Sequence, residues 1–114
     1  MSESMKTFLI APVRGQAEGR WRGVVDKLSQ DGWEVYWPSR DTAQDGTSAH
    51  ICTANYQAIL EAEAVHIIWD GKSQGCLFDL GMAFALSKRI IPIDLPPKSE
   101  GKSFQNFIRE IRAA

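Results

Sequence analysis

The stretch Ser73-Gln-Gly-Cys-Leu-Phe-Asp79-Leu-Gly-Met-Ala-Phe-Ala-Leu86 lies between two short apolar runs, at residues 64–69 and 90–93. From position 76 onward its apolar residues occur on all sides of a 3.6-residue period, which is typical of a helix buried on most of its surface. Asp70 and Gly71 close the first apolar run and supply turn residues. The pattern therefore predicts a strand, a loop, a buried helix and a second strand.

Asp79 is the only charged residue in this predicted helix. A carboxylate in apolar surroundings is costly unless it is paired, hydrogen-bonded or protonated. Its place near the helix start favours the ionised form, because free amide groups and the helix dipole stabilise an anion there. Asp79 is either a functional carboxylate or a structural one that bonds a neighbouring loop, and the residue pattern leaves both interpretations open.

Composition places the chain among ordinary globular domains. Its 114 residues are 44% hydrophobic and carry a net charge of -1, so we expect one domain spanning residues 1–114. Without a basic run there is no electrostatic argument for a nucleic-acid or membrane partner. No apolar run approaches the roughly 20 residues of a membrane span, and the polar N-terminus is unlike a signal peptide, so we expect a cytoplasmic protein.

The chain has two cysteines, Cys52 and Cys76, and two histidines, His50 and His66. Two cysteines do not make a disulfide framework, and the four residues have no spacing typical of a metal site. We expect reduced thiols in or near the core, and neither a metal nor another cofactor.

The remaining segments continue the alternation of strands and helices. Further strands are predicted at residues 7–11 and 33–37, and further helices at residues 17–28, 50–62 and 103–111. This order predicts an α/β fold, a flavodoxin-like three-layer sandwich with a mostly parallel four-stranded sheet in the order 2-1-3-4.

In such sheets ligands bind beyond the carboxyl ends of the strands. Arg14 and Gly15 follow the first strand, and Ser73 and Gly75 follow the third. A guanidinium group and backbone amides at a helix start can hold an anion, so these residues predict a site for one phosphate. There is neither the glycine triplet of a dinucleotide site nor the Lys and Ser or Thr of a phosphate loop.

Two further features leave alternatives open. Residues 39–48 are polar and longer than a usual connection, which fits either a binding loop or a tolerated surface insertion. Asn55 lies on the same helical stripe as Ile51 and Ile59, where the core is expected. Such an asparagine is either satisfied structurally or part of a site.

Three segments resemble the nucleoside 2-deoxyribosyltransferase superfamily. The core Ser-x-Gly-x-x-x-Asp-Leu-Gly-x-Ala-x-Ala of residues 73–85 is similar to its signature, and residues 55–64 are similar to the helix before its third strand. Residues 8–15 resemble its first strand and loop, particularly in the nucleoside 5′-monophosphate N-glycosidase branch. The three segments occur in the family's order and cover most of the chain.

The resemblance implies a carboxylate that attacks C1′ of the sugar and expels the base, leaving a glycosyl-enzyme that water or a second base resolves. It assigns Asp79 as the nucleophile and Asn55 as a catalytic neighbour close to the sugar or base. Arg14 and Ser73 would hold the phosphate. Substrate-binding positions would also fall on Phe8, Pro12, Gly15 and Gly75. The resemblance further implies a homodimer acting on a small-molecule nucleoside or nucleotide.

Three positions depart from the family pattern. Asp79 replaces the usual glutamate, Asn55 the usual aspartate and Phe8 the usual tyrosine. Two functions from different classes are therefore expected: an N-glycosidase or 2-deoxyribosyltransferase, or a catalytically inactive nucleotide-binding module or sensor. An interaction domain without a small ligand is a third alternative, favoured if the tryptophans are exposed.

Overall fold

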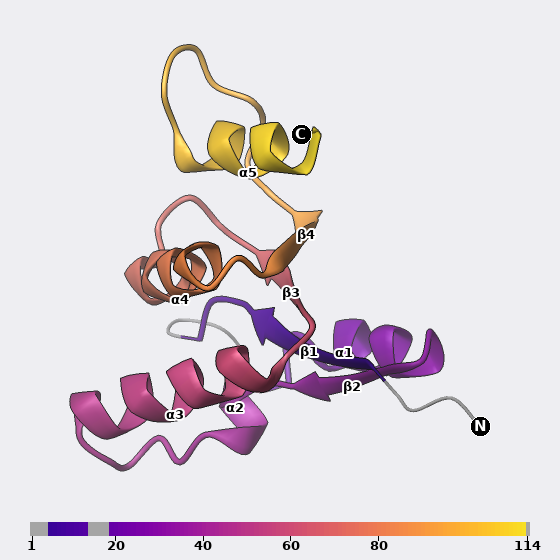
Figure 1. The fold of residues 1–114 in the computed structure, drawn as a ribbon, viewed down its shortest axis with the longest axis vertical. Coiled ribbons are helices and arrows are strands. Elements are labelled where there is room, and N and C mark those ends of the chain that lie inside the picture. The colour runs from indigo at the N-terminus through magenta and orange to yellow at the C-terminus, as the bar shows by residue number, and fades with distance from the viewer. Residues whose placement is uncertain (1–4, 14–18, 114) are drawn as a thin grey trace.

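The structure is a computed structural model that describes residues 5–13 and 19–113. Its centre is one four-stranded sheet in which every neighbouring pair is parallel. The strands are β1 (Met5–Ile10), β2 (Trp33–Tyr36), β3 (Ala64–Ile68) and β4 (Arg89–Asp94), in the order β2-β1-β3-β4 (Figure 1). The predicted α/β class and strand order are confirmed.

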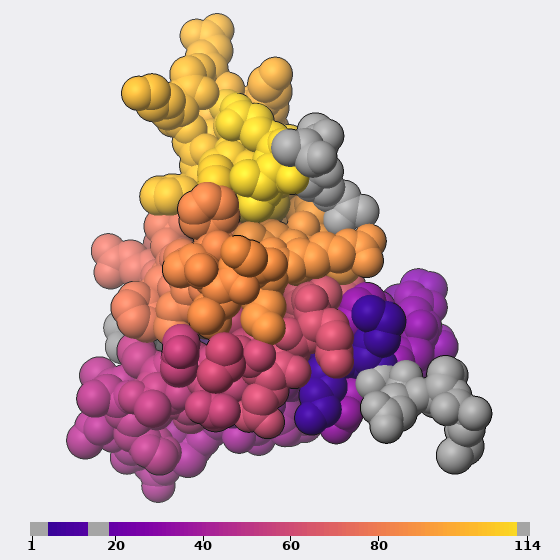
Figure 2. Space-filling view, in the orientation of Figure 1, coloured from indigo at the N-terminus to yellow at the C-terminus, as the bar shows by residue number. Residues whose placement is uncertain are grey.

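Helices link the strands and cover both faces of the sheet. They are α1 (Arg22–Gln30), α2 (Pro38–Asp41), α3 (Ser48–Glu61), α4 (Gln74–Ala85) and α5 (Phe104–Ala113). Figure 1 shows α3 and α4 on one side of the sheet and α1 on the other, which is a three-layer arrangement. In Figure 2 the yellow C-terminal segment forms one end of the molecule, next to the orange segment that contains β4.

The two faces of the sheet carry two separate hydrophobic clusters, because successive strand residues point to opposite faces. On β1, Phe8 and Ile10 belong to the cluster under α3 and α4, whereas Leu9 packs toward α1. Fully buried Ile108 brings α5 into the first cluster. The core thus fixes α3 and α4 side by side above the same face.

Helix α4 is less buried than its sequence predicts. Cys76, Leu80 and Ala83 form one buried stripe, but Phe78 is 54% exposed and Phe84 is 55% exposed. The reason is that only one layer of helices covers this face, so α4 can bury one side against the sheet. Within the described residues, no helix is long and apolar enough to cross a membrane.

The polar stretch 39–48 is also more structured than expected. Its first residues belong to the short helix α2, which begins at Pro38, a residue suited to a first helical position. Thr47 caps the start of α3 by accepting a hydrogen bond from the backbone N–H of His50. The irregular connection is therefore residues 42–47 alone.

Candidate active site

The loop between β3 and α4 is fixed by its own polar groups. The Asp70 carboxylate accepts hydrogen bonds from the backbone N–H groups of Lys72 and Ser73, each at 2.8 Å, and the Trp69 indole donates to the Ser73 carbonyl at 3.1 Å. Gly71 takes a φ of 81°, which favours glycine. Burial alone would raise the pKa of Asp70, but these backbone bonds outweigh it and lower the pKa. The loop therefore presents the start of α4 in one defined position.

Ser73 is the N-cap of α4, and its hydroxyl oxygen accepts a hydrogen bond from the backbone N–H of Cys76 at 3.4 Å. The hydroxyl proton is not used by this bond, so Ser73 can still donate to a ligand. Gly75 is exposed in the first turn of α4, and a Cβ placed on it would meet no atom within 4 Å. Both predicted anion-binding residues of this loop thus lie together at a helix N-terminus.

Asp79 lies in the second turn of α4 and is half-buried. Burial raises the pKa of its carboxyl group to about 7, and hydrogen bonding with the Asn55 side chain lowers it in part. The loss of hydration thus outweighs the stabilisation of the anion expected from a position near the helix start. Near neutral pH the carboxyl group exists in both protonation states, which suits a group that must react.

Asn55 lies on the neighbouring helix α3 and is 8% exposed. Its carbonyl oxygen Oδ1 accepts a hydrogen bond from the Thr42 hydroxyl at 2.8 Å. The Thr42 hydroxyl is in turn 2.6 Å from the hydroxyl of Tyr36, the last residue of β2. A continuous polar chain therefore runs from Tyr36 through Thr42 and Asn55 to Asp79.

Phe8 and Pro12, two predicted substrate-binding residues, are buried in this structure. Phe8 is fully buried and stacks on Tyr36, with ring centroids 5.5 Å apart. Pro12 follows β1, and its carbonyl accepts a hydrogen bond from the Trp21 indole at 2.9 Å. Arg14 and Gly15 lie outside the described residues.

Cys76, one turn before Asp79, is buried, and this burial raises the pKa of its thiol to about 11. The negative charges of Asp79 and Asp70 raise it further, against a lowering by the Ser73 hydroxyl. The thiol is therefore protonated at neutral pH and takes no part as a nucleophile. Among residues 5–13 and 19–113, no three His, Cys, Asp or Glu side chains are grouped as metal ligands.

Tyr36 and Thr42 are the site residues that sequence reasoning missed. The topology contained a signal for them, because both adjoin the carboxyl end of β2 at the edge where ligands were expected. The contact between Thr42 and Asn55 depends on the path of residues 37–42, where the sequence predicted a polar loop from residue 39 and no helix. The short helix α2 brings Thr42 back toward α3.

No protein-family model matches the sequence, and the comparison with curated proteins gives no match. Solved structures do match. The CMP N-glycosidase BcmB of Clostridium botulinum aligns over 93% of this chain and 82% of its own, with a TM-score of 0.67 and 21% identity. The 2-desoxiribosyltransferase from Leishmania mexicana aligns over 82% of this chain and 67% of its own, with a TM-score of 0.66 and 16% identity.

The TIR domain of a Toll-related receptor from Hydra magnipapillata also aligns, over 88% of this chain and 77% of its own, with a TM-score of 0.62 and 22% identity. Two nucleoside- or nucleotide-processing enzymes and a receptor domain thus have the same architecture. At these identities the similarity concerns the fold, and a function must be argued from the site. The chain has the fold of the 2-deoxyribosyltransferases and of CMP N-glycosidase, so the resemblance seen in its sequence is confirmed at the level of fold.

Proposed function

We propose that the protein cleaves the base–sugar bond of a nucleoside or nucleoside 5′-monophosphate, as an N-glycosidase or a 2-deoxyribosyltransferase, with Asp79 as the nucleophile. The observation that carries this proposal is the half-buried Asp79 carboxyl group, with a pKa near 7 and a hydrogen-bonding neighbour in Asn55. The fold shared with a CMP N-glycosidase and a 2-desoxiribosyltransferase supports the same reaction class.

In the proposed reaction an oxygen of the ionised Asp79 carboxylate forms a bond to C1′ of the sugar. The bond between C1′ and the base breaks at the same time, and the base leaves with the electron pair and takes up a proton from water. Water, or the nitrogen of a second base, then attacks C1′, gives up a proton to the solvent and releases the carboxylate. Asn55 holds the carboxylate during these steps and, being an amide, does not supply a proton itself.

The start of α4 would bind the 5′-phosphate. Ser73 has a free hydroxyl proton, and Gly75 leaves its backbone open to a ligand. A helix N-terminus favours an anion through its free amide groups. Arg14, as a guanidinium group, would complete the phosphate site by charge. A nucleoside 5′-monophosphate is therefore favoured over a nucleoside as the substrate.

The test is chromatographic detection of free bases after incubation with ribo- and deoxyribonucleosides and with their 5′-monophosphates, each supplied separately. Asp79→Asn is the control, because it keeps the size of the side chain and removes the nucleophile. Base release by the native protein and none by Asp79→Asn supports the proposal. Adding a second free base then separates transfer, which yields a new nucleoside, from hydrolysis, which yields free sugar.

Failure to release base from any substrate would overturn the proposed catalysis, provided that circular dichroism shows a folded protein. The alternative is then a nucleotide-binding module without turnover. Calorimetric titration with the same monophosphates decides that question, and Arg14→Ala should weaken binding of monophosphates much more than binding of nucleosides.

A further inference from the structure

The hydroxyl chain that leads to Asn55 has a defined direction. Each hydroxyl group has one proton to donate. The Thr42 hydroxyl donates its proton to Oδ1 of Asn55 at 2.8 Å, so the Tyr36 hydroxyl, 2.6 Å away, must donate to Thr42. Every proton in the chain therefore points toward Asn55.

The hydrogen bond from Thr42 to Oδ1 leaves the other end of the Asn55 amide for Asp79. With Oδ1 occupied by Thr42, the amide nitrogen is the end left for the carboxylate, and only the nitrogen can donate a hydrogen bond to it. If the amide turned over, Oδ1 would face the carboxylate and two acceptors would oppose each other. The Thr42 hydroxyl would then accept from the amide nitrogen, and its hydrogen bond with Tyr36 would reverse direction.

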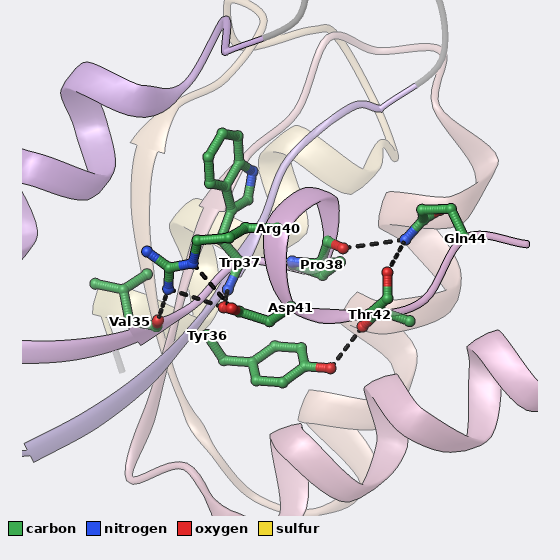
Figure 3. A network of polar contacts seen from close by, with 8 residues as sticks. All are labelled: Val35, Tyr36, Trp37, Pro38, Arg40, Asp41, Thr42 and Gln44. Atoms are coloured by element: carbon green, nitrogen blue, oxygen red, sulfur yellow. Dashed lines mark hydrogen bonds and ion pairs between the residues drawn. The ribbon is translucent and has the colours of Figure 1, made fainter.

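The surrounding structure holds Thr42 in place on both sides of its side chain (Figure 3). Its backbone N–H donates to the Pro38 carbonyl at 3.0 Å, and its own carbonyl accepts from the Gln44 side chain at 3.0 Å. The Gln44 amide also donates to the Pro38 carbonyl, which closes the turn. The position of the Thr42 backbone is thus set by its hydrogen bonds with Pro38 and Gln44.

Helix α2 is also bound to β2 and to the residue that follows it by hydrogen bonds. The Asp41 carboxylate accepts a hydrogen bond from the Trp37 backbone N–H at 2.8 Å, and the Arg40 guanidinium bridges Asp41 and the Val35 carbonyl. At the other end of the chain, stacking on Phe8 fixes the ring of Tyr36. Both hydroxyl groups are therefore held on rigid elements of the fold.

We propose that Tyr36 and Thr42 are positioning residues that hold the Asn55 amide with its nitrogen toward the Asp79 carboxylate. As a statement about the nucleophile, the proposal rests on the proposed function. The proposal assigns a role to two residues outside the motif of the resembling family, and one of the two hydroxyl groups, that of Tyr36, lies on β2. The two hydroxyl groups act through Asn55 and touch neither the sugar nor the base.

Among residues 5–13 and 19–113, few groups act on Asp79. Within this part of the chain, Asn55 from α3 is the neighbour that affects the pKa of the Asp79 carboxyl group besides burial. On α4 itself Cys76 lies one turn away, with its thiol protonated, and Asp70 at the loop acts on that thiol rather than on Asp79. A change in the titration of Asp79 after substitution of Thr42 is therefore attributable to Asn55.

The experiment follows the Asp79 side-chain carboxyl carbon by ¹³C NMR through a pH titration, with the signal assigned by its loss in Asp79→Asn. Thr42→Val removes the hydroxyl at similar volume, and we expect the titration midpoint to rise by about one pH unit, which lowers the ionised fraction at pH 6 about tenfold. Thr42→Ser keeps the hydroxyl and should restore the wild-type midpoint. Thr53→Val, at an exposed position of α3, is the control for the substitution itself.

Tyr36→Phe provides an independent test, because it removes one oxygen and retains the stacked ring; Tyr56→Phe, at an exposed position, is its control. We expect a smaller rise of the midpoint in the same direction. An unchanged midpoint in folded Thr42→Val, or in folded Tyr36→Phe should Thr42→Val not fold, would overturn the positioning role. Because the titration needs no substrate, it gives its answer even if no base release is found, so the two proposals fail separately.

Discussion

Phe8 and Tyr36 are register partners on β1 and β2, and their rings are stacked with an interplanar angle of 12°. The sequence resemblance implies that Phe8 stands where a tyrosine is usual, so the hydroxyl that it would place on β1 is absent. Tyr36 carries a hydroxyl group on the adjacent strand and connects it through Thr42 to Asn55. The hydroxyl group that Phe8 lacks is thus present on the neighbouring ring, that of Tyr36.

The pH dependence of base release should reflect the raised pKa of Asp79. A nucleophilic carboxylate must be ionised, and burial raises its pKa to about 7. We expect kcat/KM to increase with pH up to a midpoint near 7 and to fall about tenfold per pH unit below it. Initial rates between pH 4.5 and 9 measure this. A midpoint near 4 would mean that the carboxyl group is well hydrated.

The same carboxyl group should make stability fall as pH rises. The folded chain holds the Asp79 proton up to about pH 7, whereas in the unfolded chain the carboxyl group has its ordinary pKa of 3.8. The folded state therefore binds more protons between these values, and its free energy of unfolding decreases through that window by at most about 4 kcal/mol. Above pH 7 this contribution is constant.

Urea unfolding of the wild type and of Asp79→Asn at pH 4.5 and pH 8 isolates the effect, since other carboxyl groups are common to both proteins. We expect Asp79→Asn to gain stability relative to the wild type between the two pH values. Equal pH dependence in the two proteins would show that Asp79 has an ordinary pKa.

The sequence was sufficient for the fold because its signals are local and consistent. Apolar runs bounded by turn residues predicted β3 and β4, and the polar break at residues 70–73 predicted the loop that positions α4. The predicted extent of burial of α4 was wrong, because the exposure of Phe78 and Phe84 depends on how many helices share one face of the sheet.

The site was predictable only in part for a similar reason. Asp79 and Ser73 are visible as unusual residues in their own segment. The contact between Thr42 and Asn55 joins two segments through a short helix of four residues, α2, and a single proline gave only a weak sign of it. Long-range hydrogen bonds of this kind follow from the tertiary path of the chain, which residue periodicity does not specify.

Ser73→Ala should affect both helix stability and phosphate binding. Loss of an N-cap costs about 0.5–2 kcal/mol, and the Ser73 bond of 3.4 Å is long, so we expect the lower end of this range. Thr47→Ala removes the N-cap of α3 and serves as the matched control. Both substitutions are made together with Asp79→Asn, which prevents turnover, and monophosphate binding is measured by calorimetry. We expect weaker binding for Ser73→Ala and unchanged binding for Thr47→Ala. Equal affinity in both variants would remove Ser73 from the phosphate site.

The two cysteines should differ sharply in reactivity. Cys76 is buried and its pKa is raised to about 11, whereas Cys52 is partly accessible. The native protein should therefore react with Ellman's reagent at one thiol within minutes, and at the second only after unfolding in guanidinium chloride. Rapid reaction of Cys76 in native protein, identified by peptide mass analysis, would contradict the packing of α4 on β3.

Gly75 and Gly81 allow a direct test of where a ligand approaches α4. Both are exposed glycines in the same helix, and at each a Cβ would meet no atom within 4 Å. Alanine has the higher helix propensity, so Gly75→Ala and Gly81→Ala should both keep or raise the free energy of unfolding, by up to about 1 kcal/mol. Neither glycine is therefore required by the folded chain itself.

The two variants should differ, however, in how they bind a ligand. If a phosphate group binds the backbone at the start of α4, a Cβ at position 75 occupies its space, whereas one at position 81 lies farther along the helix. We expect Gly75→Ala to weaken monophosphate binding about tenfold or more, with Gly81→Ala at the wild-type affinity. Calorimetric titration of both variants, together with urea unfolding, separates binding from stability. Wild-type affinity in Gly75→Ala would place the phosphate away from the start of α4, because a ligand that contacted this backbone would meet the added methyl group.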